Sequence, residues 1–471
     1  MAIKGLSFPI TVLTIISCGC ASDRYEGSPP IRSSLGREHA ASRSPQQAPV
    51  APSGVPELAE PNGVVTLRDA MALALAHNPQ LGIYPYDLRA ADARVQQAGL
   101  RPNPEVQIEI EEFGGRGERS GFDAAETTLQ VGQPIELGGK RARRTAVASL
   151  DKELVQWDYK SARLDVMRQA TLAFAAVLAA QERLALTERL LELSRQAQAA
   201  VAQRVKAGKD SPVDELRADV AFSESRIERQ KAEKALIAAR HALAAVWGSR
   251  APAFEKVEGD FYKTSEPLPL AEMTAAASNN PDLARWATEE DRRRAALRLE
   301  KAQAAPDVTV GGGVRRFEQT DDEALVFGLA MPIPLLNRNQ GAVAAAMAEL
   351  AKARQQYEAA QIATLAALSQ ATSALAAAYD EVTISRNDVL PKAQQAFEAA
   401  QQGYQQGKFD YLHLLDTQRT LFQTQAQYVD STEVYHKAQA DVERLTGRYL
   451  ETDSNDGRPS NPVQELSPQA K

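Results

Sequence analysis

The chain has 471 residues, of which 44% are hydrophobic but only 6% aromatic, an alanine-rich composition that suits long helices better than a thick globular core. Its formal net charge is −7 and the sequence has no extended stretch rich in Lys and Arg, which argues against nucleic acid as a partner. The sequence lacks a glycine-rich phosphate loop after a strand, a CxxC pair, an HExxH motif and a nucleophile elbow. We therefore predict neither an enzyme nor a bound cofactor.

Residues 1–20 have the form of a secretory signal. Lys4 precedes the apolar run Leu6 to Ile16, which is too short to cross a membrane as a helix. The end of this run, through Ser17 and Cys18, resembles a bacterial lipoprotein signal, in which a cysteine becomes the acylated first residue. We expect a lipid anchor on Cys18 or on its rival Cys20, with an ordinary cleaved signal as the alternative. The chain has no other cysteine, so we expect no disulfide framework.

Two segments have the composition of disordered chain. Residues 21–62 are rich in Pro, Ser, Ala and Gln and predict a tether, and residues 448–471 predict a flexible polar tail. Between them we predict a first repeat at 63–248, a linker at 249–267 and a second repeat at 268–447.

An internal duplication is the basis of that division. Four landmarks recur in the same order, 202 or 199 residues apart: Pro79 and Pro281, Pro104 and Pro306, Gly208 and Gly407, and Gly248 and Gly447. Both prolines of the first pair stand in an Asn-Pro-x-Leu motif. Such agreement is hard to obtain by chance, so each half is predicted to be one structural unit.

Each unit is predicted to contain short helices, a β-hairpin and a long helical hairpin, in that order. In the first unit these are helices at 67–77 and 82–99, strands at about 104–137 around a loop at 114–123, and helices at 140–205 and 212–247. In the second they are strands at about 306–335 and helices at 340–402 and 411–446, the first of these kinked by Pro391.

The helix at 140–205 contains no proline and no glycine, which predicts about 100 Å of continuous helix at 1.5 Å per residue. It carries two apolar stripes at coiled-coil spacing. The first is Leu164, Met167, Thr171, Phe174 and Leu178; the second is Val166, Ala170, Ala173, Val177, Ala180, Leu184 and Leu191. Two stripes predict a neighbour on each side, as in a wall or closed ring. A two-helix coiled coil with an untidy seam is the alternative.

The four strands alternate apolar and polar residues, most clearly along Leu325, Phe327, Leu329, Met331 and Ile333. A four-stranded sheet has open edges, and a sheet exposed to lipid must close into a barrel. Three copies would supply twelve strands, enough for an aqueous lumen. A soluble α+β protein with two incidental hairpins is the alternative.

The sequence has duplicated Asn-Pro-x-Leu openings, a hairpin before each long helix and two Gly-Lys turns, the second of which is followed by the segment Tyr411 to Arg419. In these features it resembles the TolC-like outer-membrane efflux channel family over about residues 65–447. The segment Gln133 to Arg141 is similar to the metal-efflux branch of that family. The long tether and Pro391 depart from the family pattern, and Pro391 leaves the straightness of its helix open.

The resemblance implies a homotrimer with a twelve-stranded outer-membrane β-barrel, four strands per chain, continued by a periplasmic α-helical barrel. It also implies coupling through a periplasmic adaptor (membrane fusion) protein to an inner-membrane RND-type pump, with this chain as the passive exit duct, lipid-anchored in the outer membrane. The substrates implied are divalent heavy-metal cations of the Co, Zn, Cd and Ni type. Drug or solvent efflux and type I secretion remain alternatives, as do a periplasmic adaptor lipoprotein and a structural coiled coil.

The two helical turns hold the predicted site residues, because a tube closed at one end must open there and meet its adaptor there. Rings of three acidic residues would favour cations, and a leucine ring would resist water. The gate candidates are Asp410, Leu412 and Asp416, and the adaptor-contact candidates are Gly208, Lys209, Asp210, Pro212, Gly407 and Lys408. Any helical turn also favours such residues. His413 lies near two of the aspartates, but an exposed tip histidine is the simpler interpretation, and we predict no metal site.

Overall fold

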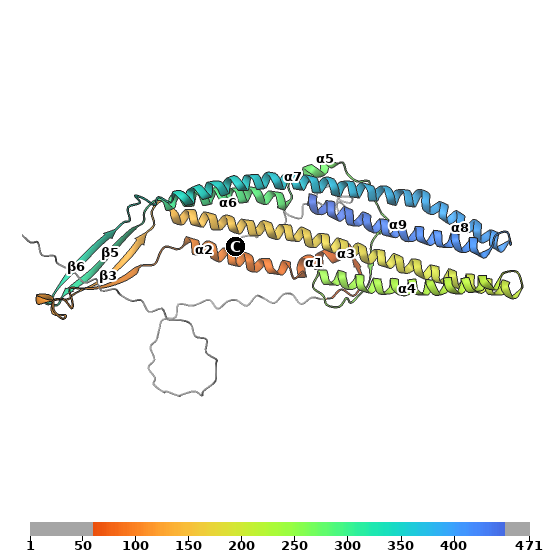
Figure 1. The fold of residues 1–471 in the computed structure, drawn as a ribbon, viewed down its shortest axis with the longest axis horizontal. Coiled ribbons are helices and arrows are strands. Elements are labelled where there is room, and N and C mark those ends of the chain that lie inside the picture. The colour runs from red at the N-terminus through yellow and green to blue at the C-terminus, as the bar shows by residue number, and fades with distance from the viewer. Residues whose placement is uncertain (1–59, 448–471) are drawn as a thin grey trace, which may run out of the picture. The chain divides into compact units, whose positions relative to one another are not determined.

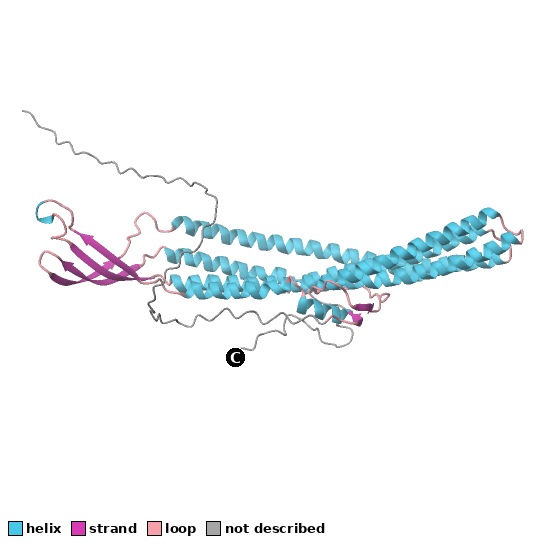
Figure 2. Cartoon of the chain, turned by 90° about the horizontal axis from the view of Figure 1, so that it is seen from below, coloured by secondary structure: helices cyan, strands magenta, loops and turns pink. Residues whose placement is uncertain are grey.

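Long helices with a small sheet at one end make up the part of the chain that the computed structural model describes, residues 60–447 (Figures 1 and 2). All of these residues belong to one structural unit, Val55–Lys471. The signal with Cys18 and Cys20, nearly all of the predicted tether and the predicted tail lie outside the described residues.

The first half contains the elements that the sequence predicted, in the predicted order. They are α1 (Leu67–His77), α2 (Tyr84–Gly99), β2 (Glu105–Glu111), β3 (Glu126–Ile135), α3 (Lys140–Lys206) and α4 (Pro212–Val246). Helix starts follow the local chemistry, since the hydroxyl of Thr66 accepts from the Asp69 amide and the hydroxyl of Ser211 accepts from the Val213 amide. The 67 residues of α3 form one unbroken helix.

The second half repeats the order. Its elements are α5 (Leu270–Ala277), α6 (Pro281–Gln303), β5 (Val308–Phe317), β6 (Asp322–Ala330), α7 (Gln340–Ile384), the π-helical turn η3 (Ser385–Val389), α8 (Leu390–Gln405) and α9 (Tyr411–Thr446). The kink expected at Pro391 takes the form of η3, because proline cannot donate a helical hydrogen bond and the preceding turn widens to accommodate it.

Helix α3 packs against neighbours on more than one side. Helices α2 and α4 follow each other along it, while α6 and α9 also pack against it (Figure 1). Phe174 and Val177, one from each predicted stripe, are buried in a cluster with Trp247 and Phe254. The alternative of a simple two-helix coiled coil is therefore wrong.

The Asn-Pro motif makes the same contact in both halves. The side-chain amide of Asn78 donates to the carbonyl of Val246 (2.6 Å), at the end of α4. That of Asn280 donates to the carbonyls of Arg444 (2.8 Å) and Leu445 (3.0 Å), at the end of α9. Both asparagines are buried, so each amide satisfies helix-end carbonyls that water does not reach.

The four long strands form one antiparallel sheet in the order β2-β3-β5-β6, with the two hairpins joined through β3 and β5. The outer strands β2 and β6 have no strand partner on their free edges within residues 60–447. Leu137, Met331 and Ile333 were expected inside strands, but β3 ends at Ile135 and β6 at Ala330.

A second, two-stranded sheet was not predicted. Strand β1 (Gly63–Thr66) pairs in parallel with β4 (Phe254–Glu258). Strand β4 lies inside the segment 249–267, which was expected to be a linker. Phe254, Val257 and Phe261 bury their side chains in the cluster around Trp247. The segment is therefore an ordered part of the fold that crosses between the two halves.

Candidate functional site

The four-stranded sheet has one apolar face that no described residue covers. In-register rows place Val106, Val131, Gly312 and Phe327 side by side, and Ile108, Leu129, Val314 and Leu325 in the next row. The side chains of Ile108, Leu325 and Phe327 are 67%, 89% and 75% exposed. A sheet on a soluble core buries this face, so the exposure distinguishes it from an ordinary hairpin pair.

The opposite face of the sheet is polar. Arg315 donates to Thr128 (2.9 Å) and Glu126 (2.9 Å) and lies 3.2 Å from Glu111. Glu105 and Glu109 project from β2 on the same face, by the strand alternation. The sheet therefore has one apolar and one polar face.

Glycines on the polar face keep a recess of about 590 Å³ open. Gly132, Gly311 and Gly328 are opposite one another in three neighbouring strands. The side chain of Gln130 lies over two of them, and a Cβ added at Gly311 would sit 2.2 Å from its Nε2 atom. Larger residues at Gly311 would displace Gln130, so the glycines are needed for this close contact.

The two helical turns lie together at the other end of the described chain (Figure 1). In the first turn Arg204 donates to Asp210 through Nε (2.8 Å) and Nη2 (3.0 Å), and the Tyr404 hydroxyl from α8 donates to the same carboxylate (2.7 Å). The Arg204 guanidinium also lies 4.7 Å from the centre of the Tyr404 ring. This three-residue cluster, the inter-hairpin clamp, joins the first helical hairpin to the second.

Hydrogen bonding and burial favour the protonation states that the clamp requires. The hydrogen bonds from Arg204 hold the pKa of the Asp210 carboxyl below its usual value. Burial, and then the bond to Asp210, raise the pKa of Tyr404 well above that of a free tyrosine. At neutral pH Asp210 is therefore charged and Tyr404 is a hydrogen-bond donor.

The second turn leaves its acidic residue exposed. Asp410 caps α9 by accepting from the His413 amide (3.0 Å), and the two side chains meet at 2.6 Å. These contacts lower the pKa of Asp410, whose side chain remains 65% exposed. Phe409 packs against Gly403, where an added Cβ would lie 2.1 Å from the ring.

The predicted site residues divide into two groups. Asp210 belongs to the inter-hairpin clamp and its side chain is only 10% exposed. The others are all exposed: Gly208, Lys209, Pro212, Gly407, Lys408, Asp410, Leu412 and Asp416. Among residues 60–447 no group of three or more His, Cys, Asp or Glu side chains is arranged to hold a metal ion.

Sequence reasoning missed Arg204 and Tyr404. Arg204 follows the helical pattern of α3 without distinction, and Tyr404 is 194 residues from Asp210 in the sequence. A cue was present in the spacing, since both residues lie three or four positions before the glycine of a predicted turn. Only the packing of the two hairpins shows that Arg204 and Tyr404 both donate to Asp210.

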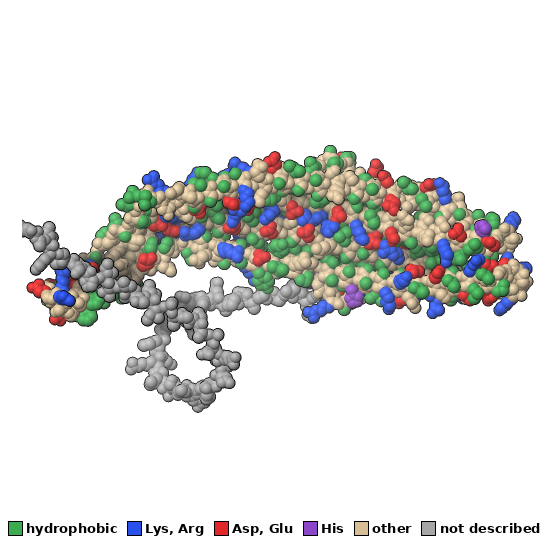
Figure 3. Space-filling model, in the orientation of Figure 1, with side chains coloured by type: hydrophobic (Ala, Val, Ile, Leu, Met, Phe, Trp, Pro, Cys, Tyr) green, Lys and Arg blue, Asp and Glu red, His purple; other side chains and the backbone are tan. Residues whose placement is uncertain are grey.

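The helical part carries acidic, basic and hydrophobic side chains intermixed on the face seen in Figure 3. Many of the charged side chains form ion pairs between helices, including Arg444 of α9 with Asp165 of α3 and Asp282 of α6. Such pairs fix which helices are neighbours more than they add stability.

Comparisons with known proteins agree with this architecture. The chain is 34% identical over 390 residues to the cobalt-zinc-cadmium resistance protein CzcC of Cupriavidus metallidurans, covering 83% of this chain and 91% of CzcC. It is 26% identical to the nickel-cobalt-cadmium resistance protein NccC of Alcaligenes xylosoxydans xylosoxydans, covering 66% and 70%. The crystal structure of the outer membrane protein VceC of Vibrio cholerae has the same fold, with a TM-score of 0.68 at 19% identity, covering 81% of this chain and 96% of that one.

The match to a family extends over both halves of the chain, in two separate segments. Residues 70–249 and residues 273–448 each match the family described as outer membrane efflux protein. These segments include both long helical hairpins and all four strands of the exposed sheet. The chain belongs to the outer membrane efflux protein family.

Proposed function

We propose that this chain is the outer-membrane channel of a tripartite efflux pump, a passive exit duct for divalent heavy-metal cations of the Co, Zn, Cd and Ni type. The observation that carries the channel assignment is the sheet, with one face apolar and exposed, the other polar, and both edges free within the described residues. The cation assignment is supported by the resemblance to CzcC and NccC, which are named for resistance to such metals.

A membrane explains the sheet better than water does. Hydrocarbon cannot form hydrogen bonds with the backbone groups at a free sheet edge, so a lipid-exposed sheet has to close into a barrel. Three copies supply twelve strands, with the apolar rows toward lipid and the face of Glu105, Glu109 and Arg315 toward an aqueous lumen. Helix α3 and the stretch α7–α8 also each contain a segment apolar enough for a membrane span, of which 44% and 17%, respectively, is buried inside the protein.

The helical part then forms the periplasmic tube. Exposed residues of the two turns, Lys209, Pro212, Gly407 and Lys408, face the site where an adaptor would dock, and the adaptor links the tube to an inner-membrane RND-type pump. Three copies of Asp410, Leu412 and Asp416 surround the narrow end. A lipid anchor on Cys18 or Cys20 adds attachment to the outer membrane.

Adjacent substitutions on one strand test the barrel. Ile108→Arg places a charge on the apolar face, which costs about 2–4 kcal/mol for an arginine facing lipid at the membrane midplane. The variant should therefore form no heat-modifiable trimers in the outer-membrane fraction. Gln107→Arg, one residue away on the polar face, is the control and should give normal trimers. Equal yields from the two variants would contradict the assignment of the faces.

Gene deletion tests the substrate. Cells lacking the protein should become more sensitive to cobalt, zinc, cadmium or nickel, and the full-length gene should restore resistance. Copper and a drug panel serve as comparisons. Sensitivity to drugs with unchanged metal tolerance would overturn the cation assignment while leaving the channel assignment in place.

A further inference from the structure

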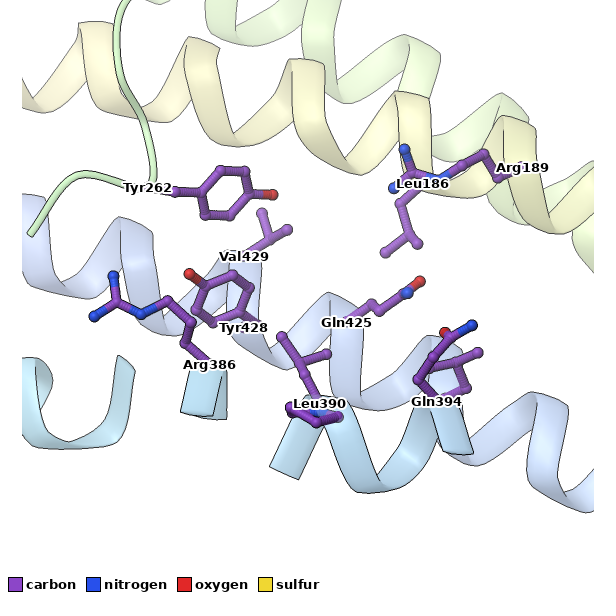
Figure 4. A pocket seen from close by; sticks show the side chains of 11 residues that line it. Leu186, Arg189, Tyr262, Arg386, Leu390, Gln394, Gln425, Tyr428 and Val429 are labelled. Carbon is purple, nitrogen blue, oxygen red and sulfur yellow. The ribbon is translucent and has the colours of Figure 1, made fainter. Parts of the chain in front are cut away.

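A pocket of about 360 Å³ lies beside the helix break at η3 (Figure 4). One wall comes from α3, through Leu186, and the opposite wall from the break, through Arg386, and from the start of α8, through Leu390. Helix α9 supplies the floor, and Tyr262, from the segment between the two halves, covers one side. The pocket therefore touches both helical hairpins and the segment that connects them.

The tyrosines give the pocket a rigid aromatic wall. The rings of Tyr262 and Tyr428 are stacked, with centroids 5.1 Å apart and planes 7° apart. The Tyr262 hydroxyl donates to Glu182 (3.0 Å), and burial, followed by the charge of Glu182, raises the pKa of that hydroxyl well above its usual value. Tyr262 thus stays neutral and fixed, and the stacked ring of Tyr428 offers a flat apolar surface to the pocket.

Two arginines lie at opposite ends of the pocket. In Figure 4 the Arg386 side chain is beside Tyr428 and that of Arg189 is near Leu186. Neither arginine has a carboxylate within ion-pair distance among residues 60–447, although Arg183, six residues before Arg189 on α3, pairs with Asp430 and Glu433. Within residues 60–447 the one side-chain hydrogen bond of Arg386 goes to Asn387, at 3.4 Å.

The acidic residues nearest in sequence are already engaged. Asp388 pairs with Lys392, and Glu182 accepts from Tyr262. The amide of Gln394 already donates to Glu398 (2.8 Å). The two guanidinium groups without an ion-pair partner and the amide of Gln425 place hydrogen-bond donors beside an apolar wall. This combination suits an organic anion and disfavours a metal cation.

We propose that the pocket binds an amphipathic organic anion, an aromatic carboxylate being the simplest. Its ring lies against Tyr428, Leu390 and Leu186, and its carboxylate pairs with Arg386 or Arg189. A bound anion contacts the broken helix of the second hairpin and the unbroken helix of the first, so it resists their relative movement. The inference does not depend on the transport function or on which substrate is exported.

Binding of 2-naphthoate to the full-length protein in lipid nanodiscs tests the proposal, by isothermal titration calorimetry or saturation-transfer NMR. The double variant R189Q/R386Q should bind at least about tenfold more weakly, a change of about 1.4 kcal/mol. Arg195→Gln removes an exposed arginine of α3 that lies outside the pocket and should bind as the original protein does. Circular dichroism should confirm that all variants remain folded.

A second measurement needs no variant. The neutral analogue 2-naphthamide keeps the ring but not the charge, and it should bind the original protein at least about tenfold more weakly than 2-naphthoate. Equal binding of the two compounds, undiminished binding to the double variant, or no binding of 2-naphthoate at millimolar concentration would each overturn the proposal.

Discussion

The two helical turns begin with nearly the same sequence, Gly208-Lys209-Asp210 and Gly407-Lys408-Phe409-Asp410, yet their aspartates have different surroundings. Asp210 is held by Arg204 and Tyr404 from two helices, whereas Asp410 only caps its own helix. One inserted aromatic residue and one arginine six positions earlier make the difference. Similar turn sequences therefore do not imply similar roles, because the neighbouring hairpin decides which side chain is clamped.

Removing Arg204 from the clamp should have the largest effect on the difference between the two turns. Arg204→Gln leaves the mostly buried Asp210 carboxylate without its charged partner, which costs about 2 kcal/mol since hydrogen bonds to charged groups contribute ~1.5–3 kcal/mol. Hydrogen exchange of the amides near the first turn should accelerate, and channel conductance in planar bilayers should rise. Arg195→Gln, at an exposed pair with Glu192, is the matched control. Unchanged exchange in Arg204→Gln would show that the clamp does not hold the turns.

A methyl group at Gly403 should disturb the second turn somewhat less. Gly403→Ala places its Cβ in the Phe409 ring, and the displacement should cost about 1–2 kcal/mol of overpacking. Gly341→Ala is the control, because no atom lies within 4 Å of its added Cβ, and it should leave stability unchanged or slightly raise it. Thermal unfolding of the purified protein measures both. Similar melting temperatures for the two variants would contradict the packing of Phe409.

Acid should remove the contribution of Asp210 to the clamp. The pKa of Asp210 is lowered in the folded protein, so its contribution to stability is fully present above the unfolded value of about 3.9 and is lost as the pH falls through the lowered folded value. Exchange near the first turn should therefore be constant from pH 7 to 5, after correction for intrinsic rates, and increase below about pH 4. The same profile in Arg204→Gln would exclude Asp210 as its origin.

Removing a single hydroxyl should have a smaller effect. Tyr404→Phe keeps the ring over Arg204 but loses the hydrogen bond to Asp210, at a cost of about 1 kcal/mol. Local hydrogen exchange near the turns is again the measurement. Tyr357→Phe is a control, since that hydroxyl is a partner in no hydrogen bond of the described residues.

The exposed gate candidates should affect stability least. Leu412→Ala and Asp416→Ser should each change the free energy of unfolding by less than about 0.5 kcal/mol, as exposed positions usually do. Their expected effect is on ion conductance, which should increase in planar bilayers. Unchanged conductance in both variants would remove these residues from the gate.

Much of the fold follows from local chemistry in the sequence. The absence of proline and glycine from 140–205 predicts α3, alternation predicts the four strands, and Asp410 predicts where α9 begins. These features depend on residues close together in the chain, so a single sequence is sufficient to place them.

Contacts between distant segments could not be predicted in the same way. The pairing of β3 with β5, the position of Tyr404 over Arg204 and the pocket beside Tyr262 all depend on how the two halves pack. Strand β4 was missed because its five residues are too few for a clear pattern. The sequence thus predicted the turns as a site but not which of their aspartates is clamped.

The parallel pairing of β1 with β4 bears on how the chain folds. Thr66 and Glu258 are register partners although nearly 200 residues separate them, and the whole first helical hairpin lies between them. Contacts of such long sequence separation form slowly, because closing the long intervening loop costs chain entropy before the contact stabilises the fold. We therefore expect the local hairpin of α3 and α4 to form first, which brings the ends of the loop together, and the two short strands to pair afterwards.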